Sequence, residues 1–157
     1  MASIKLKTIE LVYFDIKNKV HLEYMKKIIR DESIFSRFQG ILPSLNSRNS
    51  FFDKAFLISY RGEFIGLVKI GKYNDKEHTV YINGFAIDKE HRGVKLEGSE
   101  LSLGYISNNE INEYIFNTYP QVESIMITVS TENPTGKKAA IRYGYSQISD
   151  IHFLRRK

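Results

Sequence analysis

Arg92 and Gly93 lie at a junction where the chain could bind a phosphate group. They follow residues 79–87, which are mostly β-branched, apolar or aromatic, and they precede a segment with helical periodicity. The first amides of a helix have no partners within the helix, and the helix dipole is positive at that end. Because Arg92 and Lys95 add positive charge, the sequence predicts a site for an anionic group where this helix starts.

Other common catalytic centres are not indicated by the sequence. The chain has no cysteine, which excludes a disulfide, a thiolate nucleophile and a thiolate metal ligand. Its four histidines are scattered without the spacing of metal ligands, so no metal site is expected. Neither a serine–histidine–aspartate arrangement nor a Gly-x-Ser-x-Gly motif is present, which disfavours hydrolase chemistry.

The phosphate-binding junction needs strands and helices that hold it in place, and the periodicity of the sequence predicts both. The order of these elements predicts an α+β fold with a mixed, mostly antiparallel sheet and one parallel junction. Arg61 and Gly62 mark a tight hairpin between two of the strands. Expected strands cover residues 4–12, 55–60, 63–70, 79–87, 123–130 and 148–154; expected helices cover 18–30, 98–118 and 133–143, with a short helix and a loop over 31–52. The residues expected on the inner face of the helix 98–118 are Leu101, Tyr105, Ile111 and Ile115.

Length and composition are those of a globular domain. With 157 residues, 42% hydrophobic and 26% charged, the chain is expected to form one domain over residues 1–157. It contains neither the roughly 20 apolar residues of a membrane span nor a signal peptide, so a cytoplasmic location without a membrane partner is expected. The net charge of +5 would suit an anionic nucleotide or a nucleic acid. Since the lysines and arginines are spread among acidic residues, nucleic acid is the weaker expectation.

The junction around Arg92 resembles the pyrophosphate loop of the GNAT superfamily of N-acetyltransferases, and the order of elements resembles that fold over nearly the whole chain. Family members carry Arg/Gln-x-x-Gly-x-Gly/Ala in this loop, where glycines let amides close around the pyrophosphate of acetyl-CoA. Here Lys95 and Glu97 stand where small residues are expected, and Gly98-Ser99 follow one residue late. One reading is a one-residue insertion, with Gly98-Ser99 in place of the second glycine and Lys95 paired with a phosphate. In the second reading the loop has decayed and Glu97 repels an anion; in the third it is only a turn that closes the strand.

The resemblance implies that the strand 79–87 pairs with the pantetheine arm of acetyl-CoA. The backbone of Phe85, Ala86 and Ile87 would make these hydrogen bonds. The strands 79–87 and 123–130 would splay apart, in a sheet of GNAT type with helices on both faces. Gly84 inside a strand pattern predicts a β-bulge, and in the family an amide exposed by this bulge polarises the thioester carbonyl.

A second resemblance to the family covers residues 133–145. Asn133, Gly136, Ala140 and the Gly144-Tyr145 pair stand at the offsets of the family motif. The tyrosine that usually protonates the departing CoA thiolate falls on Ala140. Tyr143, one helical turn further, is therefore the candidate acid. Asn133 is expected to cap the following helix and to contact the cofactor.

The base that takes the proton from the acceptor is harder to assign. Some relatives place a glutamate where this chain has Tyr81, and Asn83 lies nearby in the same strand. Tyr81 and Asn83 are candidate catalytic residues together with Tyr143. Glu10 or Glu63 could instead approach the site from elsewhere in the fold.

Together these features predict an acetyl-CoA-dependent N-acetyltransferase in which an amine attacks the thioester directly. The acceptor is expected to be a small-molecule or peptide amine that enters beside residues 24–52 and the C-terminal strand, and a homodimer is left open. The alternative is a GNAT-fold CoA-binding or regulatory module with little or no transferase activity; a small basic nucleic-acid binder is the third reading. The residues expected to contact acetyl-CoA are Phe85, Ala86, Ile87, Arg92, Gly93, Val94, Lys95, Gly98, Ser99 and Asn133.

Overall fold

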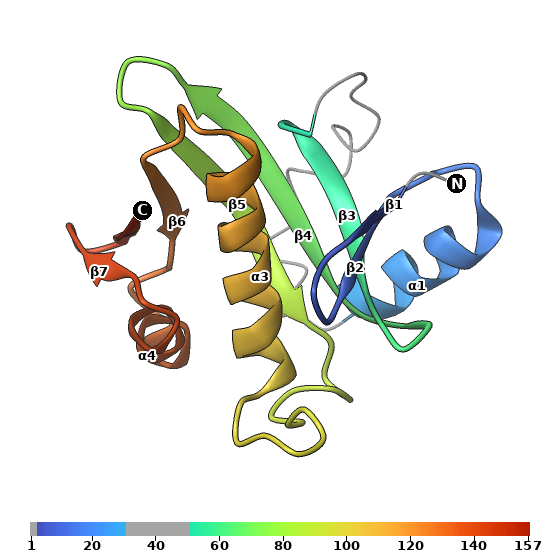
Figure 1. Cartoon of the computed structure of the whole chain (residues 1–157). Helices are drawn as coiled ribbons and strands as arrows, with labels where there is room; N and C mark the ends of the chain where they lie inside the picture. The colour runs from blue at the N-terminus through green and yellow to red at the C-terminus, as the bar shows by residue number, and fades with distance from the viewer. Residues whose placement is uncertain (1–2, 31–50) are drawn as a thin grey trace.

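The computed structural model describes residues 3–30 and 51–157, with an eight-stranded sheet at its centre (Figure 1). Across the sheet the order is β1-β2-β3-β4-β5-β6-β8-β7, and all neighbours are antiparallel except β5 and β6. The predicted α+β class, with a mixed and mostly antiparallel sheet, is confirmed. The strands are β1 (Ser3–Lys5), β2 (Glu10–Tyr13), β3 (Lys54–Tyr60), β4 (Glu63–Asn74), β5 (Thr79–Ile87), β6 (Ser124–Thr128), β7 (Ser146–Gln147) and β8 (His152–Arg156).

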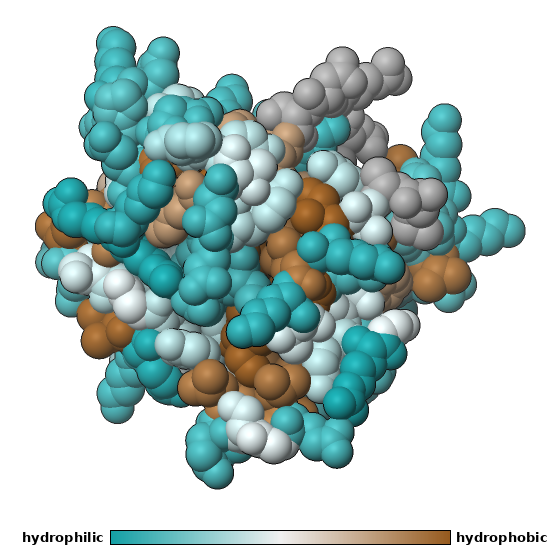
Figure 2. Space-filling model, viewed as in Figure 1, coloured by the Kyte–Doolittle hydropathy of each residue, from teal (hydrophilic) through white to brown (hydrophobic). Residues whose placement is uncertain are grey.

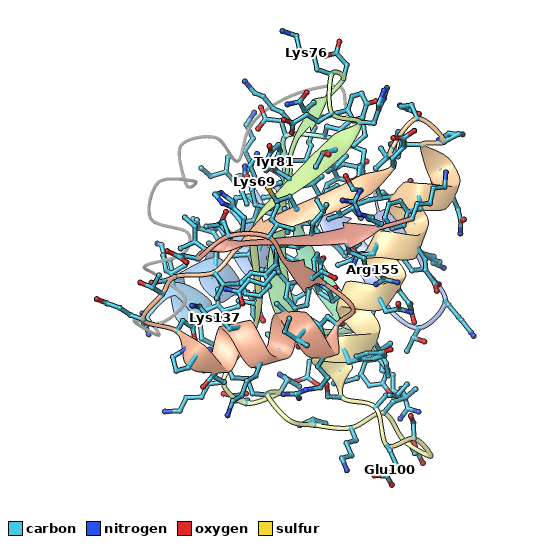
Figure 3. All side chains as sticks on the ribbon, turned by 90° about the vertical axis from the view of Figure 1, so that its left-hand side faces the viewer. Lys69, Lys76, Tyr81, Glu100, Lys137 and Arg155 are labelled. Atoms are coloured by element: carbon cyan, nitrogen blue, oxygen red, sulfur yellow. The ribbon has the colours of Figure 1, made fainter. Side chains whose placement is uncertain are left out.

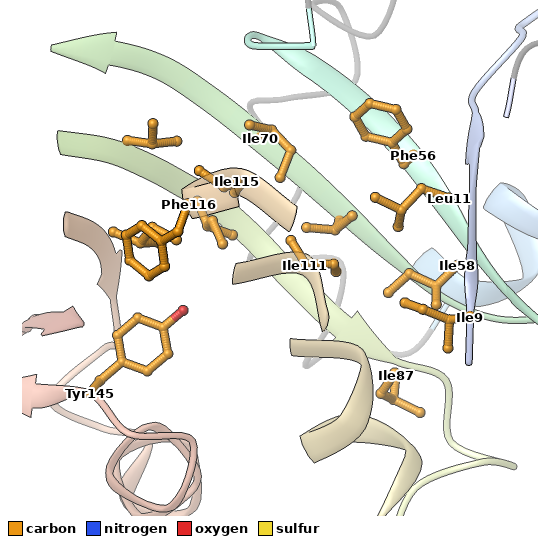
Figure 4. Packing of buried hydrophobic residues seen from close by; sticks show 14 of the residues in the cluster. Ile9, Leu11, Phe56, Ile58, Ile70, Ile87, Ile111, Ile115, Phe116 and Tyr145 are labelled. Atoms are coloured by element: carbon orange, nitrogen blue, oxygen red, sulfur yellow. The ribbon is translucent and has the colours of Figure 1, made fainter. Parts of the chain in front are cut away.

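Helices cover both faces of the sheet, as predicted. Met25 of α1 packs in a buried cluster with Leu57, whereas Ile111 of α3 packs in a second cluster with Phe56 (Figure 4). Because neighbouring residues of a strand point to opposite faces, α1 and α3 lie on opposite sides of the sheet. Ala140 of α4 belongs to the cluster on the α3 side. The described helices are α1 (Lys19–Ile29), α3 (Leu103–Thr118) and α4 (Pro134–Arg142).

The hairpin between β3 and β4 is confirmed at Arg61 and Gly62. Both residues have positive φ angles, +52° and +78°, which is the conformation of a type I′ turn. This two-residue turn matches the twist of the strands that it joins. It therefore sets the pairing of Tyr60 with Glu63, before the register shifts between Ile58 and Ser59.

The strand expected over residues 4–12 is wrong as a single element. β1 and β2 form an antiparallel pair, and the turn between them is closed by Leu6 N–H, which donates to the Ile9 carbonyl at 2.9 Å. The Glu110 carboxylate of α3 holds this turn by accepting from the N–H groups of Thr8 (2.6 Å) and Ile9 (3.2 Å). Alternating polar and apolar residues fit one long strand and a hairpin equally well, so the pattern alone missed the turn.

Other boundaries shift by smaller amounts. The helix expected over residues 18–30 is confirmed as α1, with Asn18 as its N-cap. β4 extends to Asn74, and the expected last strand 148–154 is replaced by β7 and β8. The short helix expected after residue 30 lies almost entirely outside the described residues. Among the helices that the structure describes, none has the length and apolar character needed to cross a membrane.

Candidate functional site

The strands β5 and β6 separate partway along their length. Parallel pairing joins residues 79–82 of β5 to residues 124–127 of β6 and stops there, although β5 continues to Ile87. β4 remains paired with β5 up to that end. In the described part of the chain, residues 83–87 therefore have a strand partner on one side only. The other side of such a strand can form hydrogen bonds to an extended ligand.

A β-bulge interrupts β5 at this point of separation. Two consecutive residues of β4 pair with Gly84 and Ile82, which leaves Asn83 as the extra residue of β5. The bulge expected at Gly84 is therefore present, one residue earlier. The side chain of Asn83 lies over Gly71, since a Cβ added to that glycine would come within 2.9 Å of the Asn83 amide group. Ile70 points to the α3 face, so Gly71 and the Asn83 side chain lie on the α1 face.

The segment between β5 and α3 folds back on itself as a small hairpin. A bridge pairs Lys95 with Ser102, and Ser99 N–H donates to the Leu96 carbonyl at 2.9 Å beside Gly98. The helix start expected near residue 98 is therefore wrong, because α3 begins only at residue 103. Gly98 and Ser99 lie at the tip of the hairpin and not at the start of the helix. No local pattern in the sequence indicates this fold-back, which depends on hydrogen bonds between residues several positions apart.

Charged residues of this hairpin pair with other side chains at the surface. Lys95 Nζ lies 2.9 Å from the Glu100 carboxylate, and Figure 3 shows Glu100 at the outer end of the loop. Glu97 lies 3.0 Å from Arg61, in the turn between β3 and β4. Arg92 turns back toward the sheet, since its Nε donates to the Ile87 carbonyl at 3.0 Å. Arg92 is thus held close to the end of β5, whereas Lys95 points along the hairpin.

Apolar residues of the same loop reach the surface. Leu101, expected on the inner face of the helix, precedes α3 and is 46% exposed, so that prediction is wrong. Ile111 and Ile115 are fully buried, as predicted, and Tyr105 is partly buried. On the face of the molecule shown in Figure 2, which is otherwise largely hydrophilic, hydrophobic residues gather in a band down the middle.

The first turn of α3 is capped by groups of the protein itself. Ser102 is the N-cap, and its Oγ accepts from Tyr105 N–H at 3.1 Å. Leu103 N–H donates to the Val94 carbonyl at 2.8 Å. Gly104, the second residue of the helix, has no side chain at this position. Sequence reasoning missed Ser102 and Gly104, although the preference of serine for N-caps was a usable signal.

Tyr143 connects the end of α4 with the start of α3. Its ring packs edge-on against Phe85 and Tyr105, with centroids 6.4 and 6.0 Å away. Its hydroxyl lies 2.8 Å from the position that a Cβ on Gly104 would take. The hydroxyl therefore stands in front of the first turn of α3, while Ala140, one helical turn earlier, is buried.

The three candidate catalytic residues lie on two faces of the sheet. Val80 and Ile82 point into the cluster on the α3 side, so Tyr81 between them points to the α1 side, together with Asn83. Tyr143 packs against the cluster on the α3 side. The structure thus brings Tyr81 and Asn83 to one face and Tyr143 to the other. A ligand that reaches both faces of the sheet would pass along the end of β5, where β6 has diverged.

Asn133 and Tyr145 fix the position of α4. The expected cap is confirmed, because Asn133 Oδ1 accepts from Gly136 N–H at 2.9 Å. Complete burial raises the pKa of Tyr145 to about 12, although its hydrogen bonds to Asn112 oppose that rise. The neutral hydroxyl accepts from Asn112 Nδ2 at 3.0 Å, which ties the residue after α4 to the middle of α3.

Glu10 and Glu63, the two alternative bases, make their contacts away from the bulge. Glu63 lies 3.3 Å from His91 beside the loop, and Glu10 stands opposite Ser59 in the pairing of β2 with β3. In the residues that the structure describes, no group of three histidine or carboxylate side chains could hold a metal ion.

Comparison with known proteins agrees with this arrangement. The acetyltransferase (GNAT) family model matches residues 22–96. An acetyltransferase from Agrobacterium tumefaciens has a similar structure, with a TM-score of 0.70 and 13% identity over 100% of this chain and 95% of that chain. The resemblance to the GNAT superfamily is confirmed. The sheet order, the parallel pair β5–β6 and its divergence are therefore those of a GNAT fold.

Two further acetyltransferase structures similar to this chain act on different acceptors. RimL, a ribosomal L7/L12 alpha-N-protein acetyltransferase in complex with coenzyme A, has a TM-score of 0.65 and 13% identity, over 99% of this chain and 98% of that chain. A variant of the spermidine N-acetyltransferase SpeG from Vibrio cholerae has a TM-score of 0.63 and 13% identity, over 95% of this chain and 94% of that chain. No curated protein matches the sequence. At these identities the similarity establishes the fold and leaves the acceptor open.

Proposed function

We propose that this GNAT domain, residues 1–157, is an acetyl-CoA-dependent N-acetyltransferase. The observation that carries the proposal is the end of β5, where a bulge at Asn83 is followed by a strand edge that β6 does not pair. This edge leads directly to Arg92 and then to the start of α3. A donor with an amide-containing arm and a pyrophosphate matches this order of an edge, a cation and a helix start.

The residues of this region fit acetyl-CoA as a co-substrate. The backbone of Phe85, Ala86 and Ile87 would pair with the pantetheine arm. A Cβ at Gly104 would come within 2.8 Å of the Tyr143 hydroxyl, so this glycine lets the proposed acid stand in front of the first turn of α3. The side chain of Arg92 would supply positive charge to the pyrophosphate.

The other proposed contacts to acetyl-CoA come from the loop after β5 and from the start of α4. Gly93, Val94 and Lys95 are proposed to border the pyrophosphate, with Ser102 as the residue added by the structure. Asn133 is proposed to contact the donor from the start of α4. Gly98 and Ser99 are no longer proposed, because they lie at the hairpin tip.

The chemistry requires modest help from the protein. The amine forms a C–N bond with the acetyl carbon, the C–S bond breaks, and the amine loses a proton. An amide at the bulge would stabilise the negative charge that develops on the carbonyl oxygen. Tyr81 and Asn83, on the α1 face, are proposed to direct the departing proton to water, and Tyr143 to donate a proton to the thiolate.

Binding of the donor is the first test. Arg92→Glu should weaken the binding of acetyl-CoA and of CoA at least tenfold, because the substitution reverses a charge beside the pyrophosphate. Isothermal titration calorimetry measures this affinity directly. Arg156→Glu is the matched control, since Arg156 pairs with Ser124 at the closed end of the β5–β6 junction. Equal affinities for the wild type and Arg92→Glu would remove Arg92 from the site.

The role of Tyr143 is tested separately. If Tyr143 protonates the thiolate, Tyr143→Phe should lower kcat by about 10²-fold, at the lower end of general acid effects, while the affinity for acetyl-CoA changes little. Tyr105→Phe is the control, because Tyr105 belongs to the same aromatic contact. Release of CoA with spermidine or with an N-terminal peptide as acceptor provides the assay. An unchanged kcat would limit Tyr143 to a packing role.

A specific observation also favours a CoA-binding module with little transferase activity. Two amides of the first turn of α3 already donate to Val94 and Ser102, and the Tyr143 hydroxyl faces Gly104. A pyrophosphate would have to displace or share these groups, which lowers affinity. Micromolar CoA binding without acetyl transfer to any amine in a broad panel would favour this second function.

A further inference from the structure

A buried carboxylate joins the loop before Arg92 to the helix α1. Asp88 is the first residue after β5 and is only 5% exposed. A carboxylate at this depth needs hydrogen bonds for both oxygens, because an unsatisfied buried charge is costly. The partners of Asp88 come from two separate parts of the chain, which makes it a link between them.

The first partner is Tyr24 of α1. The Tyr24 hydroxyl donates to Asp88 Oδ2 at 2.7 Å, across 64 residues of sequence. Burial and this hydrogen bond to Asp88 raise the pKa of Tyr24 well above its ordinary value, so the hydroxyl keeps its proton. The ring of Tyr24 packs against Phe64, with centroids 5.3 Å apart. The hydroxyl is thus held in place by its own ring packing as well as by the hydrogen bond.

The second partner is His91, one residue before Arg92. Asp88 Oδ1 accepts from His91 N–H at 3.0 Å and lies 2.6 Å from His91 Nδ1. The other ring nitrogen of His91 lies 3.3 Å from Glu63 at the start of β4. These bonds fold residues 88–91 into a tight turn. The turn determines where the backbone of Arg92 leaves the sheet.

A second contact joins the same two segments at the surface. Lys27, one turn after Tyr24 on α1, lies 3.1 Å from Glu90 in the loop. Both side chains are more than half exposed, so this ion pair contributes little by itself. Like the Tyr24–Asp88 hydrogen bond, however, this ion pair joins α1 to the loop. The contact between the two segments therefore extends over one helical turn.

We propose that Asp88 is a positioning residue that couples α1 to the loop after β5 (residues 88–94), with Tyr24 as its partner on the helix. The part that concerns CoA rests on the proposed function; the link between the two segments does not. A ligand that orders the loop then also orders α1, and loss of the Tyr24 hydroxyl loosens both segments. The Tyr24 hydroxyl donates to Asp88 and acts on the loop through that carboxylate.

Hydrogen–deuterium exchange with mass spectrometry tests the link in two arms. Without ligand, Tyr24→Phe should speed amide exchange in residues 88–94 several-fold, although the substituted residue lies in α1. With saturating CoA, the wild type should show slower exchange in α1, and Tyr24→Phe should lose this protection. Its affinity for CoA should fall about fivefold, a typical size for coupling between two sites.

Tyr73→Phe is the matched control. The Tyr73 hydroxyl lies 3.1 Å from His78 Nδ1 and donates to the Gln121 carbonyl at 3.3 Å, at the far end of β4. The control removes a comparable hydroxyl and should leave exchange in residues 88–94 unchanged. If the substitutions only lowered the stability of the whole protein, amide exchange would instead become faster throughout the chain in both variants. The increase would follow the loss in the free energy of unfolding that urea denaturation measures.

The outcomes separate this inference from the proposed function. Unchanged exchange of residues 88–94 in ligand-free Tyr24→Phe would overturn the coupling, whether or not CoA binds. Faster exchange of that loop, with no CoA binding by the wild type, would support the link and contradict the cofactor assignment. Bound CoA that protects α1 equally in the wild type and in Tyr24→Phe would also overturn the coupling.

Discussion

The end of β5 and the start of α3 contribute differently to the candidate cofactor site. The end of β5 keeps the features of a GNAT fold: it is paired with β4 on one side, carries a bulge at Asn83, and diverges from β6. The start of α3 departs from the family loop, since residues 95–102 fold into a hairpin and Ser102 caps the helix. The strand would bind a donor through its backbone, whose geometry the sheet fixes. The loop depends on small side chains at particular positions, and substitution there changes its shape.

This contrast indicates which part of the site tolerates sequence change. The pairing of β4 with β5 continues through Gly66 and Ile87 regardless of most side chains on the two strands. The loop is closed by the short-range backbone hydrogen bonds of its own hairpin, and the charges of residues 95–102 pair with one another or with Arg61. Experiments that disturb each region separately can therefore break or sharpen the comparison.

The largest effect is expected from Gly66→Ala in β4. A Cβ at Gly66 would collide with the carbonyl oxygen of Ala86, which is backbone and cannot move aside by rotation. The free energy of unfolding should fall by about 1–3 kcal/mol, the usual cost of overpacking, and CoA binding should be lost. Urea denaturation and calorimetry measure the two effects. Lys72→Ala, at an exposed site on the same strand, should change stability by less than about 0.5 kcal/mol.

Gly104→Ala should have an intermediate effect and should separate binding from stability. The new methyl group would meet the Tyr143 hydroxyl at 2.8 Å, at the end of a side chain that can shift. Helix propensity favours alanine over glycine by about 1 kcal/mol, so the thermal midpoint should change little. The methyl group would fill the space in front of the first turn, so CoA affinity should fall about tenfold, which is about 1.4 kcal/mol.

The matched double substitution tests whether the methyl group acts through Tyr143. Adding Tyr143→Phe to Gly104→Ala removes the hydroxyl that the methyl group would meet. If that contact alone weakens binding, the double variant should regain CoA affinity relative to Gly104→Ala. No recovery would assign the loss to direct obstruction of the ligand.

The smallest effect is expected from Glu97→Gln in the hairpin. Glu97 lies 3.0 Å from Arg61, and both side chains are mostly exposed. Loss of this negative charge should tighten CoA binding by less than about threefold, and the difference should shrink as salt is added. Glu100→Gln, which carries the other acidic charge of the hairpin, is the comparison. Weaker CoA binding by Glu97→Gln would mean that the Arg61–Glu97 pair helps to shape the site.

The sequence by itself determined the order of the main elements and the positions of a turn, a helix cap and a β-bulge. The tight hairpin at Arg61 and Gly62, the N-cap at Asn133 and the bulge beside Gly84 follow from local preferences. Such preferences act over a few residues, so a single sequence can reveal them. The divergence of β5 from β6 was expected only from the resemblance to the GNAT family, and the structure confirms it.

Tertiary structure decided what depends on contacts between distant residues. The N-terminal turn is held by Glu110, the hairpin 95–102 closes through a bridge between its own ends, and Tyr143 faces Gly104 across 39 residues of sequence. Asp88 likewise acquires its role only when Tyr24 is folded against it. Each of these arrangements is set by three-dimensional packing and by the need to satisfy buried polar groups, and none is encoded in the spacing of neighbouring residues.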